Sequence, residues 1–119
     1  MRKIITILLF IFWSTISYAL EEDYTKFWCA QQKGMVEVKL ADATRCDCLT
    51  TTHSIEVDYA NKFYEAVGQS LHYSIMTKKL PGILLLIKDT GDNVYLARLK
   101  NIIIKYKLPI TVWTLKINK

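Results

Sequence analysis

The hydrophobic period of this chain changes from two residues to about 3.6 in its middle, and this change limits the folds that the chain can adopt. Across residues 45–50 and 53–59, apolar side chains such as Leu49, Ile55 and Val57 alternate with polar ones, which is typical of two half-buried strands. Residues 60–77 then follow the helical period. The sequence therefore predicts a β-hairpin that leads directly into an amphipathic helix.

Three carboxylates are expected on one side of this hairpin. A tight turn centred on Thr51 and Thr52 sets Asp47 opposite Glu56, and residues directly opposite in an antiparallel ladder share a face. Asp58 lies two residues beyond Glu56 and points the same way. Because β-branched threonine suits the positive φ of a two-residue turn poorly, a longer loop with another register is the alternative.

The helix predicted over residues 60–77 has an apolar side and a separate polar stripe. The side expected to face the core comprises Ala60, Phe63, Tyr64, Val67, Leu71 and Ile75. Lys62, Gln69 and Tyr73 fall within about 40° of one another, away from the apolar centre. A cation, an amide and a phenol are therefore expected close to the carboxylates.

Carboxylates that meet a lysine beside an amide and a phenol suit the hydrolysis of phosphodiesters. Carboxylate oxygens bind Mg²⁺ or Mn²⁺, and a bound metal activates water and neutralises charge on the phosphate. The lysine then orients the nucleophile or stabilises the developing charge. The pattern indicates a metal-dependent nuclease.

These residues resemble the PD-(D/E)XK nuclease superfamily, whose restriction-endonuclease-like fold carries an Asp on a hairpin and then an acidic residue two positions before a Lys. Asp47 matches the Asp and Glu56 the acidic residue, so the resemblance implies that both bind the metal. Gln69 and Tyr73 match the Q-x-x-x-Y element of the RecB-like exonuclease branch and would orient the substrate or the nucleophile. The phrase DCLTTTHSIEVD is also similar to the pattern D-C-L-T-x-T-H-x-I-E-x-D of a smaller group of bacterial nuclease-like proteins.

The chain departs from the superfamily motif at Asp58, which stands where the motif has Lys. Some members carry the lysine on the following helix, and Lys62 would serve in that way, while Asp58 would assist or occupy the vacated position. The resemblance then implies a nuclease that acts on nucleic acid, with DNA favoured. The alternative is a catalytically inactive domain of the same fold that binds nucleic acid or a protein partner in the cell envelope.

Residues 1–19 have the features of a signal peptide. Arg2 and Lys3 precede an apolar segment, and Ser17-Tyr18-Ala19 offers small residues at the two positions that a signal peptidase recognises. Cleavage after Ala19 would leave a single domain of residues 20–119, exported to the periplasm or secreted, without stable membrane insertion. The net charge would fall from +5 to +3, because Arg2 and Lys3 are lost. A mildly basic surface permits contact with phosphate backbones, although scattered solvated charges explain it equally well.

Three cysteines in an exported chain predict one disulfide and one thiol. Cys46 and Cys48 flank Asp47, and either could reach Cys29 on a helix expected over residues 21–32. The resemblance favours Cys29 with Cys48, because Cys48 belongs to the D-C-L-T phrase. Zinc binding by the cysteines is the rival interpretation, but no fourth ligand stands at a standard spacing.

The remaining segments predict a mixed sheet covered by helices. A first strand is expected at residues 35–40, a break at Pro81-Gly82, a fully buried strand at 83–87, a helix at 94–106 and a last strand at 110–115. A helical crossover would make the strand at 83–87 parallel to the one before it. Periodicity alone supports an α/β class. The resemblance implies the finer assignment, a restriction-endonuclease-like αβββαβ core with an extra C-terminal helix and strand.

Overall fold

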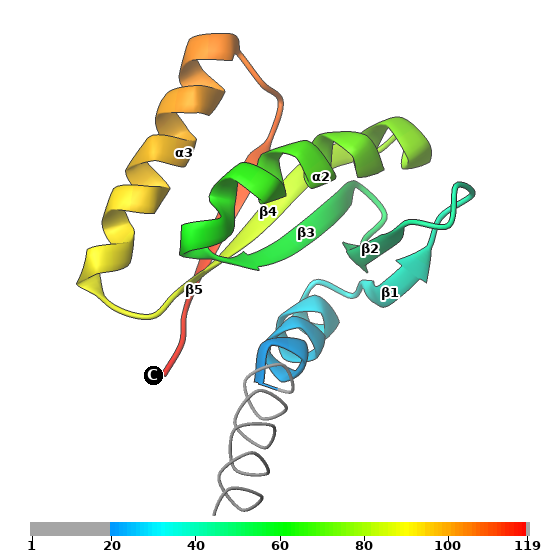
Figure 1. Cartoon of the computed structure of the whole chain (residues 1–119). Coiled ribbons are helices and arrows are strands. Elements are labelled where there is room, and N and C mark those ends of the chain that lie inside the picture. Colours follow the sequence, from blue (N-terminus) through cyan, green and yellow to red (C-terminus); the bar gives the residue numbers. More distant parts are fainter. Residues whose placement is uncertain (1–19, 119) are drawn as a thin grey trace, which may run out of the picture.

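The structure, a computed structural model, describes residues 20–118 (Figure 1). The signal peptide predicted for residues 1–19 lies outside the described residues. The described chain begins in a helix that extends to residue 31. Among residues 20–118, no helix is both long enough and apolar enough to cross a membrane.

Five strands form one mixed sheet in the order β1-β2-β3-β4-β5. They are β1 (Met35–Lys39), β2 (Arg45–Leu49), β3 (His53–Tyr59), β4 (Leu80–Ile87) and β5 (Thr111–Lys116). The first three strands pair antiparallel, whereas β4 is parallel to both β3 and β5. The predicted α/β class and mixed sheet are therefore confirmed.

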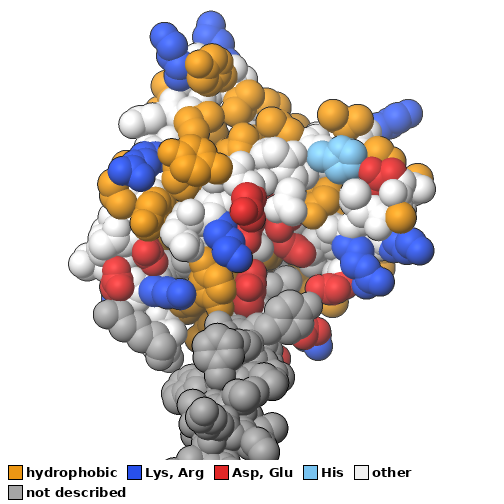
Figure 2. All heavy atoms as spheres, viewed as in Figure 1, with side chains coloured by type: hydrophobic (Ala, Val, Ile, Leu, Met, Phe, Trp, Pro, Cys, Tyr) orange, Lys and Arg blue, Asp and Glu red, His pale blue; other side chains and the backbone are white. Residues whose placement is uncertain are grey.

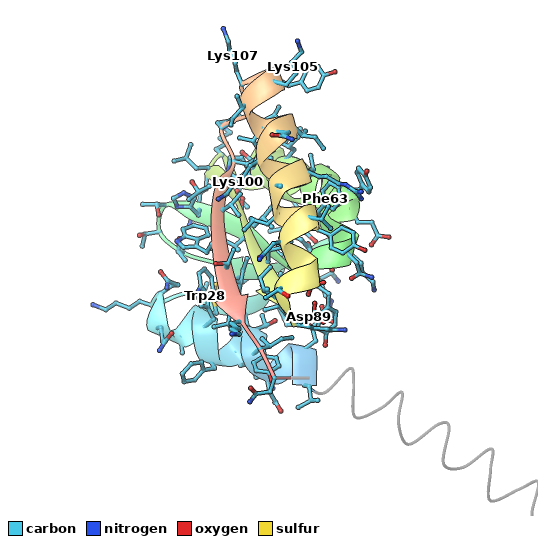
Figure 3. All side chains as sticks on the ribbon, turned by 90° about the vertical axis from the view of Figure 1, so that its left-hand side faces the viewer. Trp28, Phe63, Asp89, Lys100, Lys105 and Lys107 are labelled. Atoms are coloured by element: carbon cyan, nitrogen blue, oxygen red, sulfur yellow. A yellow bond between two sulfur atoms is a disulfide. The ribbon has the colours of Figure 1, made fainter. Side chains whose placement is uncertain are left out.

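Two helices supply the crossovers that parallel pairing requires. They are α2 (Phe63–Thr77), between β3 and β4, and α3 (Asn93–Tyr106), between β4 and β5. Both pack on one face of the sheet, against Ile83 and Leu85 of β4. The N-terminal helix packs on the opposite face through Trp28 and Cys29, and Figure 3 shows Trp28 and Phe63 on opposite sides of the β5 ribbon. The apolar run of β4 is thus covered on both faces, as its sequence predicted.

The register of β2 and β3 is the one that a turn centred on Thr51 and Thr52 predicts. The pairs are Cys48 with Ile55 and Leu49 with Ser54. Neither turn threonine has a positive φ. Instead, Thr50 Oγ1 accepts hydrogen bonds from the backbone N–H groups of Thr52 and His53, at 3.3 and 2.9 Å. Local side-chain hydrogen bonding therefore closes a turn that glycine would otherwise favour.

The rotation of α2 about its axis differs from the prediction. Residues Ala60–Lys62 form a 3₁₀ turn (η1), which advances the chain by about 60° more than three α-helical residues would. Ala66 and Ser70 are fully buried, and these small side chains allow the helix to lie close to the sheet. Tyr64 and Ile75, expected in the core, are therefore 66% and 75% exposed.

The break predicted at Pro81-Gly82 is wrong, because both residues lie inside β4. Pro81 stands at the second position of the strand, near the end where proline is tolerated. A Cβ at Gly82 would lie 2.8 Å from the ring of Trp113 and 3.0 Å from the side chain of Ile55. The glycine therefore makes room for Trp113 of β5 to pack across β4.

Candidate active site

The Asp47 side chain continues the connection between β2 and β3 beyond the last backbone pairs. The ladder includes Cys48 with Ile55, and Asp47 Oδ2 then accepts a hydrogen bond from the backbone N–H of Val57 at 2.8 Å. The carboxylate thereby takes a donor that would otherwise need a backbone acceptor. Asp47 is held between the two strands, next to Glu56 on β3.

Buried Glu56 and half-buried Asp47 form a carboxyl pair. Glu56 is only 5% exposed. Burial, the hydrogen bond with Asp47 and the negative charges of Asp47 and Asp58 together raise the pKa of Glu56 to about 10. Burial also raises the pKa of Asp47, although hydrogen bonds from Glu56 and from Val57 N–H oppose the rise. At neutral pH the pair therefore shares a proton.

Asp58 extends this pair into a carboxylate cluster, which we define as Asp47, Glu56 and Asp58. Burial and the charges of Glu21 and Asp47 raise the pKa of Asp58 to about 7, while the charge of Lys62 opposes the rise. Lys62 lies on η1 and is exposed. The predicted lysine is therefore close enough to Asp58 to interact with it electrostatically. Figure 2 shows acidic and basic side chains side by side in the middle of the face of the molecule that is turned toward the viewer.

Tyr73 was expected on the polar stripe of α2, but it is buried, with 6% of its surface exposed. Its hydroxyl donates a hydrogen bond to Glu56, and burial together with the charge of Glu56 raises the pKa of Tyr73 above its ordinary value. Gln69, one turn earlier, is exposed and does line a groove with Tyr73. Tyr73 therefore belongs to the interior of the site, and Gln69 and Lys62 to its rim.

Glu21 is a neighbour of the site that the sequence patterns did not indicate. It lies on the N-terminal helix and is partly buried. Burial and the charge of Asp47 raise the pKa of Glu21, whereas Lys62 and Lys88 lower it. Two sequence features together could have indicated Glu21: the acidic first turn of its helix, and the disulfide that ties this helix to the strand of Asp47.

The disulfide joins Cys29 and Cys48, as predicted. Cys46 is a buried thiol, and its Sγ donates to the carbonyl oxygens of Cys48 and Ile55 at 3.4 and 3.7 Å. Burial raises the pKa of Cys46 to about 11. Because two of the three sulfur atoms form the disulfide, the rival zinc site lacks its thiolate ligands.

His53 is engaged in the fold at the other end of β3. Its Nδ1 and Nε2 atoms lie 2.8 Å from Thr52 Oγ1 and 3.0 Å from Thr111 Oγ1. Its ring packs edge-on against Trp113, with the ring centroids 5.2 Å apart. These contacts connect the β2–β3 turn to β5 and account for His53 without a catalytic role.

Two oxygen atoms of the carboxylate cluster, Glu56 Oε2 and Asp58 Oδ2, are buried without a hydrogen-bond partner. Such atoms are costly unless a proton or a cation satisfies them. Within residues 20–118, no three His, Cys, Asp or Glu side chains are placed to hold a metal ion jointly. Mg²⁺ is commonly held by one or two carboxylates together with water and substrate phosphate. The donors present therefore suit a metal that the substrate helps to bind.

Comparison with protein-family models, with curated proteins and with solved structures found no match for this chain. The functional argument therefore rests on the geometry and charge of the carboxylate cluster and its surroundings.

Proposed function

We propose that the protein is an exported, metal-dependent nuclease of the PD-(D/E)XK type, with a restriction-endonuclease-like core. The observation that carries the proposal is the pair of unpartnered buried oxygens in the carboxylate cluster. A fold gains nothing from two buried acids and a half-buried one that repel one another, and such strongly raised pKa values are typical of functional sites. The order of strands and helices is compatible with this core.

Asp47 and Glu56 are the residues that would hold Mg²⁺ or Mn²⁺. Asp47 is already fixed in place by Val57 N–H, and Glu56 by Tyr73 and Asp47. When bound, the metal would supply a nucleophilic water and neutralise charge on the phosphate. Glu56 must lose its proton to become a ligand, so we expect binding to release a proton and to strengthen as pH rises.

The other residues of the site would position the substrate and control charge. Lys62 is exposed beside Asp58, where its ammonium can reach a phosphate oxygen in solvent. The buried phenol of Tyr73 stays protonated at neutral pH, so it can only donate to Glu56 and hold that carboxyl in orientation. Gln69 stands on the rim, where its amide can contact the nucleic acid.

A catalytically inactive domain that binds nucleic acid is the second candidate. Two observations favour it: Asp58 occupies the position of the motif lysine, and Lys62 is at the rim rather than among the buried carboxyls. In that case the carboxylate cluster would keep its protons, and binding would not depend on a metal.

The cleavage of nucleic acid by residues 20–119 separates the two candidates. Labelled single-stranded and duplex DNA and RNA are incubated with the oxidised protein in Mg²⁺, Mn²⁺ or EDTA. Cleavage that needs the metal and is at least about a hundredfold slower in Glu56→Gln and Lys62→Ala supports the nuclease. Asp23→Asn, on the exposed side of the N-terminal helix, is the control and should cleave like the wild type.

The absence of cleavage by a folded wild type with either metal would contradict the nuclease proposal. Metal-independent binding by the same protein would then favour the inactive domain. If Glu56→Gln abolishes cleavage but Lys62→Ala does not, the nuclease stands and the migrated lysine is wrong.

Export to the periplasm or the exterior is part of the same proposal. It is supported by the disulfide between Cys29 and Cys48, which persists in oxidising compartments. Fractionation of cells that express the full chain, with mass spectrometry of the mature N-terminus, tests both export and cleavage after Ala19.

A further inference from the structure

A groove of about 660 Å³ runs along α2 as far as Tyr73. One wall is a stripe of α2 that includes Tyr64, Gly68 and His72, three residues spaced four apart along the helix. The other wall is the start of β2, at Thr44 and Arg45. This volume is in the range of sites that bind small molecules or single nucleotides.

Gly68 forms an open floor in this groove. Glycine is among the least favourable residues in a helix interior. Packing does not require it here, because a Cβ at this position would meet no atom within 4 Å. The absence of a side chain at Gly68 therefore keeps the groove open above the helix, where a larger residue would fill it.

Tyr64 offers an aromatic surface in the same groove. It is 66% exposed, and its ring lies 3.9 Å from that of the fully buried Phe63, measured between centroids. The Tyr64 ring thus packs against Phe63 and remains accessible to solvent. Exposed aromatic rings of this kind bind nucleic-acid bases by stacking, with little dependence on sequence.

The opposite wall carries the cation Arg45 and is tied to α2, which contributes the exposed carboxylate of Glu65 to the same groove. His72 Nε2 lies 2.6 Å from Asp42 Oδ2, which holds the β1–β2 loop against the helix. Arg45 forms only a long pair with Glu37, at 3.7 Å, with both side chains largely in solvent. Such a pair is weak, so the guanidinium can exchange Glu37 for a phosphate.

Tyr73 links the groove to the carboxylate cluster. Tyr73 lines the groove and also donates a hydrogen bond to Glu56. A ligand seated over Gly68 would therefore be separated from Glu56 by the Tyr73 side chain.

We propose that the groove binds an unpaired nucleotide next to the cleaved phosphate, with its base on Tyr64 over Gly68 and a phosphate at Arg45. Bases in a duplex are stacked and do not expose their faces, so the substrate is single-stranded nucleic acid. This inference rests on the proposed function, which left the strandedness of the substrate open.

The experiment measures binding separately from cleavage. Fluorescence anisotropy in EDTA follows a labelled oligothymidine and a duplex of equal length with the wild type, Tyr64→Ala and Gly68→Leu. We expect tighter binding of the single strand, and about tenfold weaker binding in each variant. Tyr106→Ala is the matched control: Tyr106 is 70% exposed at the end of α3, where Lys105 and Lys107 project outward (Figure 3). Thermal melts verify that each variant folds.

The outcomes distinguish the two proposals. If both groove variants bind the single strand like the wild type, or if the duplex binds as tightly, the groove assignment is overturned while metal-dependent cleavage still supports the nuclease. If the single strand binds through Tyr64 and Gly68 but no metal supports cleavage, the groove is upheld on an inactive domain. A folded wild type that neither binds nor cleaves nucleic acid overturns both.

Discussion

The buried carboxyls make the stability of this protein depend on pH in an unusual direction. The pKa of Glu56 is raised to about 10, so between its ordinary value of 4.5 and that value the folded protein binds the proton and the unfolded chain does not. The free energy of unfolding therefore falls as pH rises through this window. Asp58, with its pKa raised to about 7, adds to the effect over the lower part of the window.

Replacing Glu56 by glutamine should remove much of this dependence. Glu56→Gln imitates the protonated carboxyl and does not titrate, so we expect it to melt at a higher temperature than the wild type near pH 8 in EDTA. Below about pH 3.5 the two melting temperatures should converge, because Glu56 is then largely protonated in the folded protein and in the unfolded chain. Thermal melts across this pH range provide the measurement. A variant that is less stable than the wild type near pH 8 would show that the carboxylate itself supports the fold.

Side chains of single residues also explain what the sequence could predict of the site. The acids Asp47, Glu56 and Asp58 were predictable, because strand period and a turn centred on Thr51 and Thr52 fix their register. The contribution of Glu21 was not predictable, since it arises from contact between a helix and strands that are distant in sequence. The burial of Tyr73 was missed for a similar reason, because it depends on how α2 lies on the sheet.

At the level of elements, α2 is the helix whose placement escaped prediction. Hydrophobic period identified the helix and its approximate ends, but the 3₁₀ turn at Ala60–Lys62 shifts the phase between β3 and α2. The buried side is formed partly by the small residues Ala66 and Ser70, which a scale of hydrophobicity underrates. Hydrophobic patterns report which side chains avoid water, whereas the close approach of a helix to a sheet also requires small side chains.

Two glycines in different elements should respond to alanine in opposite ways. Gly68→Ala adds a Cβ in open space on α2 and should stabilise the protein by about 1 kcal/mol, a rise in melting temperature of about 4–8 °C for a domain of this size. Gly82→Ala places its Cβ 2.8 Å from Trp113 and should destabilise. Melting temperatures of both variants test this pair. Equal effects of the two substitutions would be inconsistent with the packing of β4 against β5.

The contact of His53 with β5 should be visible as a second, independent pH effect. Burial lowers the pKa of His53, so its contribution to stability is present above the ordinary value of 6.5 and declines as pH falls below it. His53→Ala should cost about 1 kcal/mol near pH 8, because it removes the hydrogen bond to Thr111. The gap between wild type and variant should narrow as the solution is acidified toward about pH 5. A gap that widens instead would mean that protonated His53 makes the stronger contact.

At the scale of the whole molecule, one covalent bond joins the helix on one face of the sheet to the sheet itself. Cys29 and Cys48 are 19 residues apart in sequence, and their disulfide attaches the N-terminal helix to β2. That helix covers Ile55, Val57, Leu84 and Leu86 with Trp28, and it also carries Glu21 toward Asp58. Gly34 leaves room for the bond, since a Cβ there would lie 2.8 Å from both sulfur atoms.

Reduction of the disulfide should therefore affect stability and the site together. In the chain-entropy model, loss of a loop of this length costs about 3 kcal/mol, a large share of the stability of a domain of this size. We expect a melting temperature lower by at least about 10 °C in the reduced protein and in Cys29→Ser. Because Glu21 moves away with the helix, the pKa of Asp58 should also fall toward its ordinary value, which NMR titration of its carboxyl carbon would show. Cys46→Ser, which leaves the disulfide intact, is the control and should change neither property much. If reduction lowers the melting temperature but leaves the titration of Asp58 unchanged, the N-terminal helix stabilises the fold without contributing to the site.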